Sequence, residues 1–301
     1  MSRARQLFQS QLITVERIDH SRPVPDGDHA DCESDRHSIN FVERGRFSIM
    51  VGHGHWTVGR AEIFVTVPGM AYRCRQHATS ENAAPGVCLD VCFSDWSRDP
   101  VAGVRVGALR EHTPVVAVNN RRTYLQQRLA AHLIAGCDPL AIDLIAGELL
   151  HSTLADATSV SGRYKASQLG WYAHRVDRAR EELDEHYARQ HSLAGLARTA
   201  GMSPYHFARI FRELSGLPPH RYLVRRRLNA AAKRLRDRAS VTETCYAVGF
   251  RSLSRFIHAF RAATGMTPSQ FRSAPRVRES STDSAPLVCF GSVVSRCDHR
   301  R

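Results

Sequence analysis

The chain has 301 residues, of which 43% are hydrophobic, and a formal net charge of +13. This length suffices for two domains, since single domains usually run to roughly 100–200 residues. No apolar stretch is long enough to span a bilayer, and no secretory signal core follows the N-terminus. Eight irregularly spaced cysteines do not form the dense framework of a small secreted protein. We therefore expect a cytoplasmic protein with reduced thiols and no membrane partner.

The first half of the chain reads as strands. From residue 38 to about residue 95, short runs of Val, Ile, Phe and Tyr are separated by turn residues such as Gly45, Gly52 and Gly69. Their alternation predicts antiparallel strands that bury one face, as in a small barrel. From Asn119 onward the apolar residues recur at helical spacing, which predicts two helices between residues 121 and 156.

The fold expected from these patterns is α+β with two domains. The N-terminal domain would be residues 1–155, followed by a small polar linker at residues 156–170. An all-helical domain would occupy residues 171–273, and the Ser-rich and Arg-rich tail at residues 274–301 is expected to be disordered. The apolar faces of the two helices in the N-terminal domain have to be buried, either in a dimer interface or against their own barrel; both alternatives are open.

The positive charge is concentrated in the helical domain. Between Trp171 and Ser273 there are 19 Lys and Arg residues against 8 Asp and Glu residues. A basic domain of this kind favours nucleic acid as a partner. On charge alone, a solvated basic surface without a partner remains an alternative.

The same domain contains an internal repeat. Shifting the chain against itself by 49 residues aligns Ser203 with Ser252 and continues for about twenty positions without a gap. The later matches are Phe207 with Phe256, Phe211 with Phe260, Gly216 with Gly265, Pro219 with Pro268 and Tyr222 with Phe271. One helical unit has therefore been used twice.

Each copy has the parts of a helix-turn-helix motif. In the first, residues 193–200 form a supporting helix, Gly201 permits the turn, and Ser203 caps the next helix. In the second, residues 241–247, Gly249 and Ser252 take these roles. With the phenylalanines buried, the expected DNA contacts are Tyr205, His206, Ala208, Arg209, Arg212, Leu253, Ser254, Arg255, His258 and Arg261. Half-burial is the alternative for Leu253 and Ile257.

A third helix is expected to join the two copies. It begins at Pro219 and runs to about Asp237, which makes it about 27 Å long at 1.5 Å per residue. This length is close to the ~34 Å between successive major-groove faces of B-DNA. Its basic residues would suit phosphate contacts; they are Arg221, Arg225, Arg226, Arg227, Lys233, Arg234 and Arg236.

Three motifs carry a family resemblance, and together they span residues 203–272. They are Ser203, Phe207, Arg209, Phe211 and Gly216; then Pro219, Tyr222, Arg227, Leu228 and Ala231; and finally Val248, Gly249, Phe250, Phe256, Phe260, Gly265, Thr267, Pro268, Phe271 and Arg272. The segment from about Trp171 to Arg272 resembles the DNA-binding domain of the AraC/XylS family.

This resemblance implies a function and a set of partners. It implies a sequence-specific transcriptional regulator. Because activation is the commoner behaviour of the family, it implies an activator. It also implies a cupin-like N-terminal barrel that senses a small-molecule effector or dimerises. Promoter DNA, RNA polymerase and a second copy in a homodimer are the implied partners. The chain departs from the family pattern at Thr244 and Cys245, where the family usually has an apolar Ile-Ala pair, and His258 stands at the counterpart of Arg209. Because neutral His offers one bond where Arg offers two, we expect the second unit to read sequence less stringently.

The N-terminal half contains residues that suggest two other functions. His53 and His55 followed by Glu62 resemble a metal-binding cupin, but the spacing is too long, and solvated histidines in a turn are the alternative. Cys74, His77, Cys88 and Cys92 would form a thiol sensor only if they converge, and buried apolar cysteines are the alternative. No nucleophile elbow, phosphate loop or paired CxxC motif is present, so we expect no catalysis, no cofactor and no metal.

Overall fold

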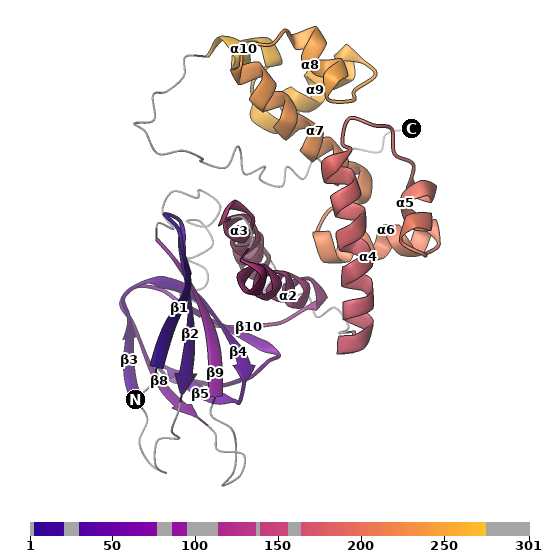
Figure 1. Cartoon of the computed structure of the whole chain (residues 1–301). Coiled ribbons are helices and arrows are strands. Elements are labelled where there is room, and N and C mark those ends of the chain that lie inside the picture. The colour runs from indigo at the N-terminus through magenta and orange to yellow at the C-terminus, as the bar shows by residue number, and fades with distance from the viewer. Residues whose placement is uncertain are drawn as a thin grey trace, which may run out of the picture. The chain divides into compact units, whose positions relative to one another are not determined.

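The structure is a computed structural model that describes residues 3–20, 30–76, 86–94, 114–136, 139–155 and 164–274. The chain divides into two compact units, residues 1–165 and residues 166–301 (Figure 1). The first is rich in strands and the second is helical, as the sequence predicts. Most of the expected tail and residues 156–163 of the expected linker lie outside the described residues, whereas residues 166–170 form the start of a helix.

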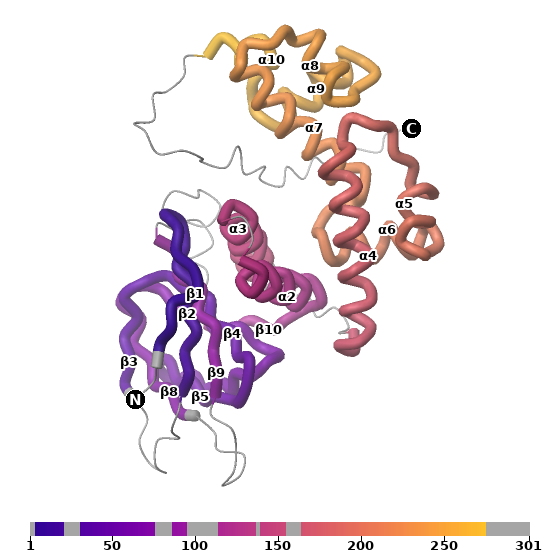
Figure 2. Tube along the Cα trace, viewed as in Figure 1, coloured from indigo at the N-terminus to yellow at the C-terminus, as the bar shows by residue number. Residues whose placement is uncertain are grey.

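The strands of the N-terminal unit form two antiparallel sheets (Figure 2). In spatial order, the six-stranded sheet holds β1 (Arg3–Gln9), β2 (Ile13–His20), β9 (Gly86–Phe93), β4 (His37–Arg44), β7 (Glu62–Thr66) and β10 (Val115–Ala117). The four-stranded sheet holds β3 (Ala30–Ser34), β8 (Met70–Gln76), β5 (Phe47–Val51) and β6 (Gly54–Val58). Within the described residues no ladder joins the two sheets, so the strands do not close into one hydrogen-bonded barrel.

The two faces of the six-stranded sheet differ in character. Val15 pairs with Val91, and Val91 with Ile39, so these three fully buried residues share one apolar face. On the other face Glu16 pairs with Asp90, and Cys92 pairs with Ser38. The strict alternation of side chains along a strand therefore gives this sheet one apolar face and one face with buried polar groups.

Two helices follow β10, namely α2 (Asn120–Ala135) and α3 (Pro139–Ala155). They lie side by side along the six-stranded sheet (Figure 1). The fully buried Arg122 joins them, because its guanidinium donates to the carbonyl of Ser152 at 2.7 Å and to that of Ala117 at 2.6 Å. Their apolar side chains are buried within the unit, which supports packing against their own sheet; these are Tyr124, Leu125, Leu129, Ile142, Ile145 and Leu149.

The C-terminal unit consists of seven helices in its described residues. They are α4 (Ala166–Glu185), α5 (Leu193–Thr199), α6 (Pro204–Ser215), α7 (Pro219–Arg236), α8 (Val241–Ala247), α9 (Leu253–Thr264) and α10 (Pro268–Ser273). Along the described residues of the whole chain, no helix is long and apolar enough to cross a membrane.

Local chemistry sets the ends of the repeated helices. The Ser203 hydroxyl accepts from the backbone N–H of His206, and the Ser252 hydroxyl accepts from that of Arg255, each at 3.4 Å. Gly216 and Gly265 end α6 and α9 with φ of +79° and +76°, a left-handed conformation that favours glycine. These caps and turns confirm the boundaries that the repeat predicts.

Candidate nucleic-acid interface

The two halves of the helical unit repeat the same aromatic packing. In the first, the ring centroids of Phe207 and Phe211 lie 5.5 Å apart, and Phe211 meets Tyr222 at 5.6 Å. In the second, Phe256 and Phe260 lie 5.7 Å apart, and Phe260 meets Phe271 at 5.3 Å. The four phenylalanines of α6 and α9 are fully buried. The internal repeat of the sequence is thus a repeat in space.

The turns of the two motifs differ in length. Four residues separate α5 from α6, whereas five residues, 248–252, separate α8 from α9. Gly201 and Gly249 both have positive φ, at +63° and +92°, so each provides the sharp bend that the motif needs. Arg251 in the second turn is exposed.

Arginines form a row on the outward face of α6 and of α9, the second helix of each helix-turn-helix motif. Arg209 and Arg212 on α6, and Arg255 and Arg261 on α9, are all exposed. Within the described residues, no ion pair or side-chain hydrogen bond engages these four guanidinium groups. Tyr205, Ser254 and His258 are exposed in the same rows, with Tyr205 83% exposed. A guanidinium without an internal partner can form a charge-assisted bond to a phosphate or a base edge.

Three of the expected contact residues sit differently. The His206 ring lies against α4, where its Nε2 is 3.2 Å from the hydroxyl of the buried Tyr172. Ala208 is half-buried. Leu253 is also half-buried and packs against the hydrophobic core that α7, α8 and α9 build around Phe256 and Phe260. Ile257 packs against the same core, so the half-buried alternative describes both residues.

The connecting helix α7 uses several of its arginines internally. Arg227 is only 8% exposed, so the structure removes it from the expected phosphate contacts. Arg226 pairs with Asp184 at 3.2 Å and Arg234 pairs with Glu243 at 3.1 Å. Arg221 and Lys233 are exposed. The sequence pattern could not separate these roles, because burial on α7 depends on which elements pack against it.

Comparison with known proteins decides the class of this unit. Residues 196–274 match a family described as a helix-turn-helix domain. The C-terminal unit is an AraC-type helix-turn-helix domain. The expected resemblance to the AraC/XylS family is thereby confirmed.

Relatives of the AraC-type domain include named regulators. AdaA of Bacillus subtilis, a bifunctional transcriptional activator and DNA repair enzyme, is 30% identical over 106 residues, covering 35% of this chain and 50% of AdaA. AarP of Providencia stuartii, a helix-turn-helix transcriptional activator, is 34% identical over 82 residues, covering 27% of this chain and 61% of AarP. The chain therefore matches between half and two thirds of the length of these relatives.

A solved structure also resembles the AraC-type domain. It is the DNA-binding domain of AdpA, a global transcriptional factor, in complex with a target DNA. The two are 32% identical, and the match covers 35% of this chain and 96% of the AdpA chain with a TM-score of 0.33.

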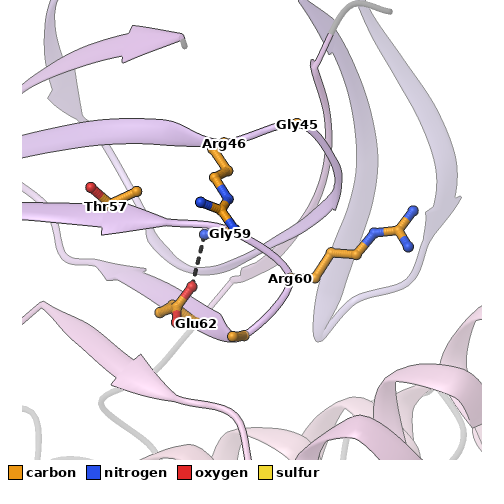
Figure 3. A pocket seen from close by; sticks show the side chains of 7 residues that line it. Gly45, Arg46, Thr57, Gly59, Arg60 and Glu62 are labelled. Carbon is orange, nitrogen blue, oxygen red and sulfur yellow. Dashed lines mark hydrogen bonds between the residues drawn. The ribbon is translucent and has the colours of Figure 1, made fainter. Parts of the chain in front are cut away.

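Outside the AraC-type domain, a pocket lies at the β4–β5 and β6–β7 turns (Figure 3). Arg46, Thr57, Arg60 and Glu62 line it, and the Glu62 carboxylate accepts from the Gly59 N–H at 2.9 Å. Glu62 is thus engaged in closing the β6–β7 turn. His53 lies in the exposed β5–β6 turn, and His55 is exposed on β6, which fits the reading of solvated histidines.

The three described cysteines of the predicted cluster lie in two different surroundings. Cys74 and Cys88 pack against an apolar cluster between the sheets, and burial raises the pKa of the Cys74 thiol to about 12. Cys92 lies instead beside Asp90, to which its Sγ donates at 3.3 Å. His77 is outside the described residues. A thiol that stays protonated at neutral pH reacts slowly, which favours the reading of these cysteines as buried apolar residues.

Sequence reasoning missed one polar cluster. Glu16, Asp90 and Cys92 bring one ligand-type atom each within 4.8 Å of one another on the polar face of the six-stranded sheet. Burial raises the pKa of the Asp90 carboxyl, against the hydrogen bonds from Cys92 and Ser38 that lower it. Arg36 lies against the same group, with its Nη1 3.8 Å from the Cys92 sulfur. The pairing of β2 with β9 creates this cluster, so no local motif announces it.

Proposed function

We propose that this protein is a sequence-specific DNA-binding transcriptional regulator whose AraC-type domain places α6 and α9 in the major groove of a promoter. The observation that carries the proposal is the pair of outward rows on these helices. Each row presents exposed arginines that have no internal partner in the part of the chain that the structure describes, while the opposite side of each helix is anchored by buried phenylalanines. Helix-turn-helix proteins read base edges with such rows.

The residues proposed to contact DNA divide by the kind of contact assigned to them. Arg209 is assigned to a base edge, where Arg bonds bidentately to guanine. Arg212, Arg255 and Arg261 are assigned to phosphates, which receive half or more of the hydrogen bonds in protein–DNA complexes. Tyr205, His206, Ala208, Ser254 and His258 complete the proposed surface, and the half-buried Leu253 is assigned to its margin.

Replacement of Arg209 by Ala tests the proposal. A binding sequence is first selected from random double-stranded oligonucleotides with the full chain, and affinity is then measured on that sequence and on a scrambled one. Arg209→Ala is expected to cost roughly 1–3 kcal/mol at one base position. Arg198→Ala, which removes an exposed arginine of the supporting helix α5, is the matched control and should affect both sequences alike. Equal losses for Arg209→Ala on both sequences would contradict a base contact.

The N-terminal unit is proposed to be a cupin-like sensing and dimerisation domain. Two antiparallel sheets with a partly polar interior support a small-molecule effector site between them. Three large apolar side chains near the α2–α3 connection support a homodimer, since Ile134 is 87%, Leu144 50% and Leu140 39% exposed. Measurement of the oligomeric state of a Leu144→Lys variant tests that part.

We further propose that the protein activates transcription through contact with RNA polymerase and has no enzymatic activity of its own. The name of AarP as an activator supports the first part, because the match covers 61% of that protein. AdaA carries a repair activity by its name, but only half of AdaA is matched. A reporter gene placed behind a selected binding sequence tests the sign of regulation.

A further inference from the structure

Residues 187–190 belong by sequence to the first helix-turn-helix half, since they lie between α4 and α5. In space they bond to the second half. The Tyr187 side chain packs against the second hydrophobic core, which α7, α8 and α9 build around Phe256 and Phe260. A segment of one half is therefore part of the core of the other.

Arg227 makes the strongest bonds to this segment. From α7 its Nε donates to the Tyr187 carbonyl and its Nη2 donates to the Arg189 carbonyl, each at 2.8 Å. The side chain is almost fully buried, and burial lowers its pKa together with the nearby charge of Arg251. Because a planar guanidinium holds two carbonyls at fixed angles, these two bonds set both the position and the direction of the segment.

The turn of the second motif completes the contact. Gln190 Nε2 donates to the Gly249 carbonyl at 3.2 Å. Gly249 itself is pressed against Ala188, so closely that a Cβ at this position would collide with the Ala188 carbonyl. Residues 187–190 thus touch both α7 and the α8–α9 turn, the two elements that orient α9.

The preceding helix α4 is itself bonded to the N-terminal half of α7. Asp184 near the end of α4 accepts from the Tyr222 hydroxyl at 2.9 Å and pairs with Arg226 Nε at 3.2 Å. Along the chain the two motifs are joined by α7 and the turns at its ends, and turns are the places where hinge rotations occur.

We propose that residues 187–190, named here the clamp segment, hold the second helix-turn-helix motif at one distance and orientation from the first. This inference rests on the proposed function. Its consequence is that the protein reads two DNA elements at a single separation, since a rigid pair of recognition helices can enter only grooves spaced to match. Arg227, Gln190 and Gly249 are then positioning residues, which set specificity without touching DNA.

Selection from a random library tests the clamp. Full-length protein is used to enrich double-stranded oligonucleotides carrying about 30 random base pairs, roughly three turns of the duplex. The separation between the two enriched elements is then read from the sequences. Wild-type protein is expected to enrich one separation. Arg227→Met, which keeps an unbranched apolar side chain in place of the aliphatic part of arginine and removes both donated bonds, is expected to spread the separation by about one base pair or more to either side.

Arg234→Met is the matched control. It makes the same substitution seven residues further along α7, but it breaks an ion pair to Glu243, which lies within the second motif. It should therefore keep the single separation of the wild type. A folded Arg227→Met protein that enriches the same single separation would overturn the clamp.

A measurement without DNA separates the clamp from the proposed function. Spin labels are introduced at the exposed Thr199 on α5 and Thr242 on α8 through unnatural amino acids, which avoids the native cysteines. The distance distribution between the labels should be narrow in the wild type and broader in Arg227→Met. If Arg227→Met does not fold, Gln190→Ala, which alters an exposed side chain, takes its place. Equal widths in variant and wild type would overturn the clamp, whereas wild-type protein that enriches no DNA would overturn the proposed function alone.

Discussion

The Tyr172 hydroxyl lies 3.2 Å from Nε2 of His206, and the two rings meet edge to face with centroids 5.5 Å apart. This pair joins α4 to the first turn of the proposed recognition helix α6. Since Tyr172 is buried, its hydroxyl has a fixed position and can orient the His206 ring.

Tyr172→Phe is expected to weaken DNA binding while leaving the fold intact. The change removes the hydroxyl, which bonds to His206 Nε2 and also accepts from Gln168 Nε2 at 3.4 Å, and it keeps the ring contact. The expected loss from the His206 bond is about 1 kcal/mol, roughly five-fold in affinity. Equilibrium binding to a selected sequence measures it. Tyr246→Phe, which removes an exposed hydroxyl on α8, is the matched control. Unchanged affinity in Tyr172→Phe would argue against a positioning role.

His258→Arg is expected to sharpen sequence reading by the second motif. His258 is exposed at the position of α9 that corresponds to Arg209 on α6. An arginine there could bond bidentately to guanine, a contact worth about 1–3 kcal/mol of discrimination. Selection with the variant should enrich a guanine in the second element that the wild type does not enrich. His258→Lys separates this effect from added charge, because lysine should raise affinity on all sequences alike.

Thr244→Val is expected to stabilise the AraC-type domain. Thr244 is fully buried on α8, and its hydroxyl oxygen has no hydrogen-bond partner among the described residues. Valine has nearly the same shape and removes the unpaired polar group, so the free energy of unfolding should rise by about 1 kcal/mol. Denaturant unfolding followed by helical circular dichroism measures this. A decrease in stability would mean that the hydroxyl has a partner in solution.

Gly249→Ala and Gly265→Ala should differ in cost although both glycines have positive φ. At Gly265 a Cβ would meet nothing within 4 Å, so the expected cost is the left-handed strain alone, about 1–2 kcal/mol. At Gly249 the Cβ would also collide with the Ala188 carbonyl, so the loss of unfolding free energy should be larger. Equal losses in the two variants would show that residue 188 moves freely.

Asp90→Asn is expected to stabilise the N-terminal unit at neutral pH and not in acid. Burial raises the pKa of Asp90 above its unfolded value, so the folded state binds the proton more tightly. The wild type is then favoured below the unfolded pKa, about 3.9, and loses stability as the pH rises through the folded pKa. The melting temperatures of variant and wild type, measured at a series of pH values, should diverge as the pH rises through the folded pKa of Asp90.

Asp35→Asn is the control with the opposite sign. The hydrogen bond from Arg36 lowers the pKa of the exposed Asp35, so its ionised form is favoured by folding. Asp35→Asn should therefore not raise the stability of the protein at any pH. If Asp90→Asn behaves in the same way as Asp35→Asn, the Asp90 carboxyl is better solvated than its surroundings indicate.

Local features of the sequence sufficed for much of the helical unit. The serine caps at 203 and 252 and the left-handed glycines at 216 and 265 act within one turn of their own position, so their spacing alone predicts where α6 and α9 begin and end. The repeat also predicts that both motifs share one packing pattern, because equivalent residues recur at equal spacing within each motif. In the N-terminal unit the alternation predicts strands, but not their division into two sheets, because pairing joins residues far apart in the chain.

Only the tertiary structure decided which charged residues are available for binding. Arg221 and Arg227 lie on the same basic helix, and no local feature of the sequence distinguishes them. Yet Arg221 is exposed, whereas Arg227 is buried and donates hydrogen bonds to the carbonyls of residues 187 and 189. The same holds for Asp90, whose neighbours come from two other strands. Caps, turns and periodicity are determined by a residue and its near neighbours along the chain. Burial and ion pairing are determined by what folding brings from elsewhere.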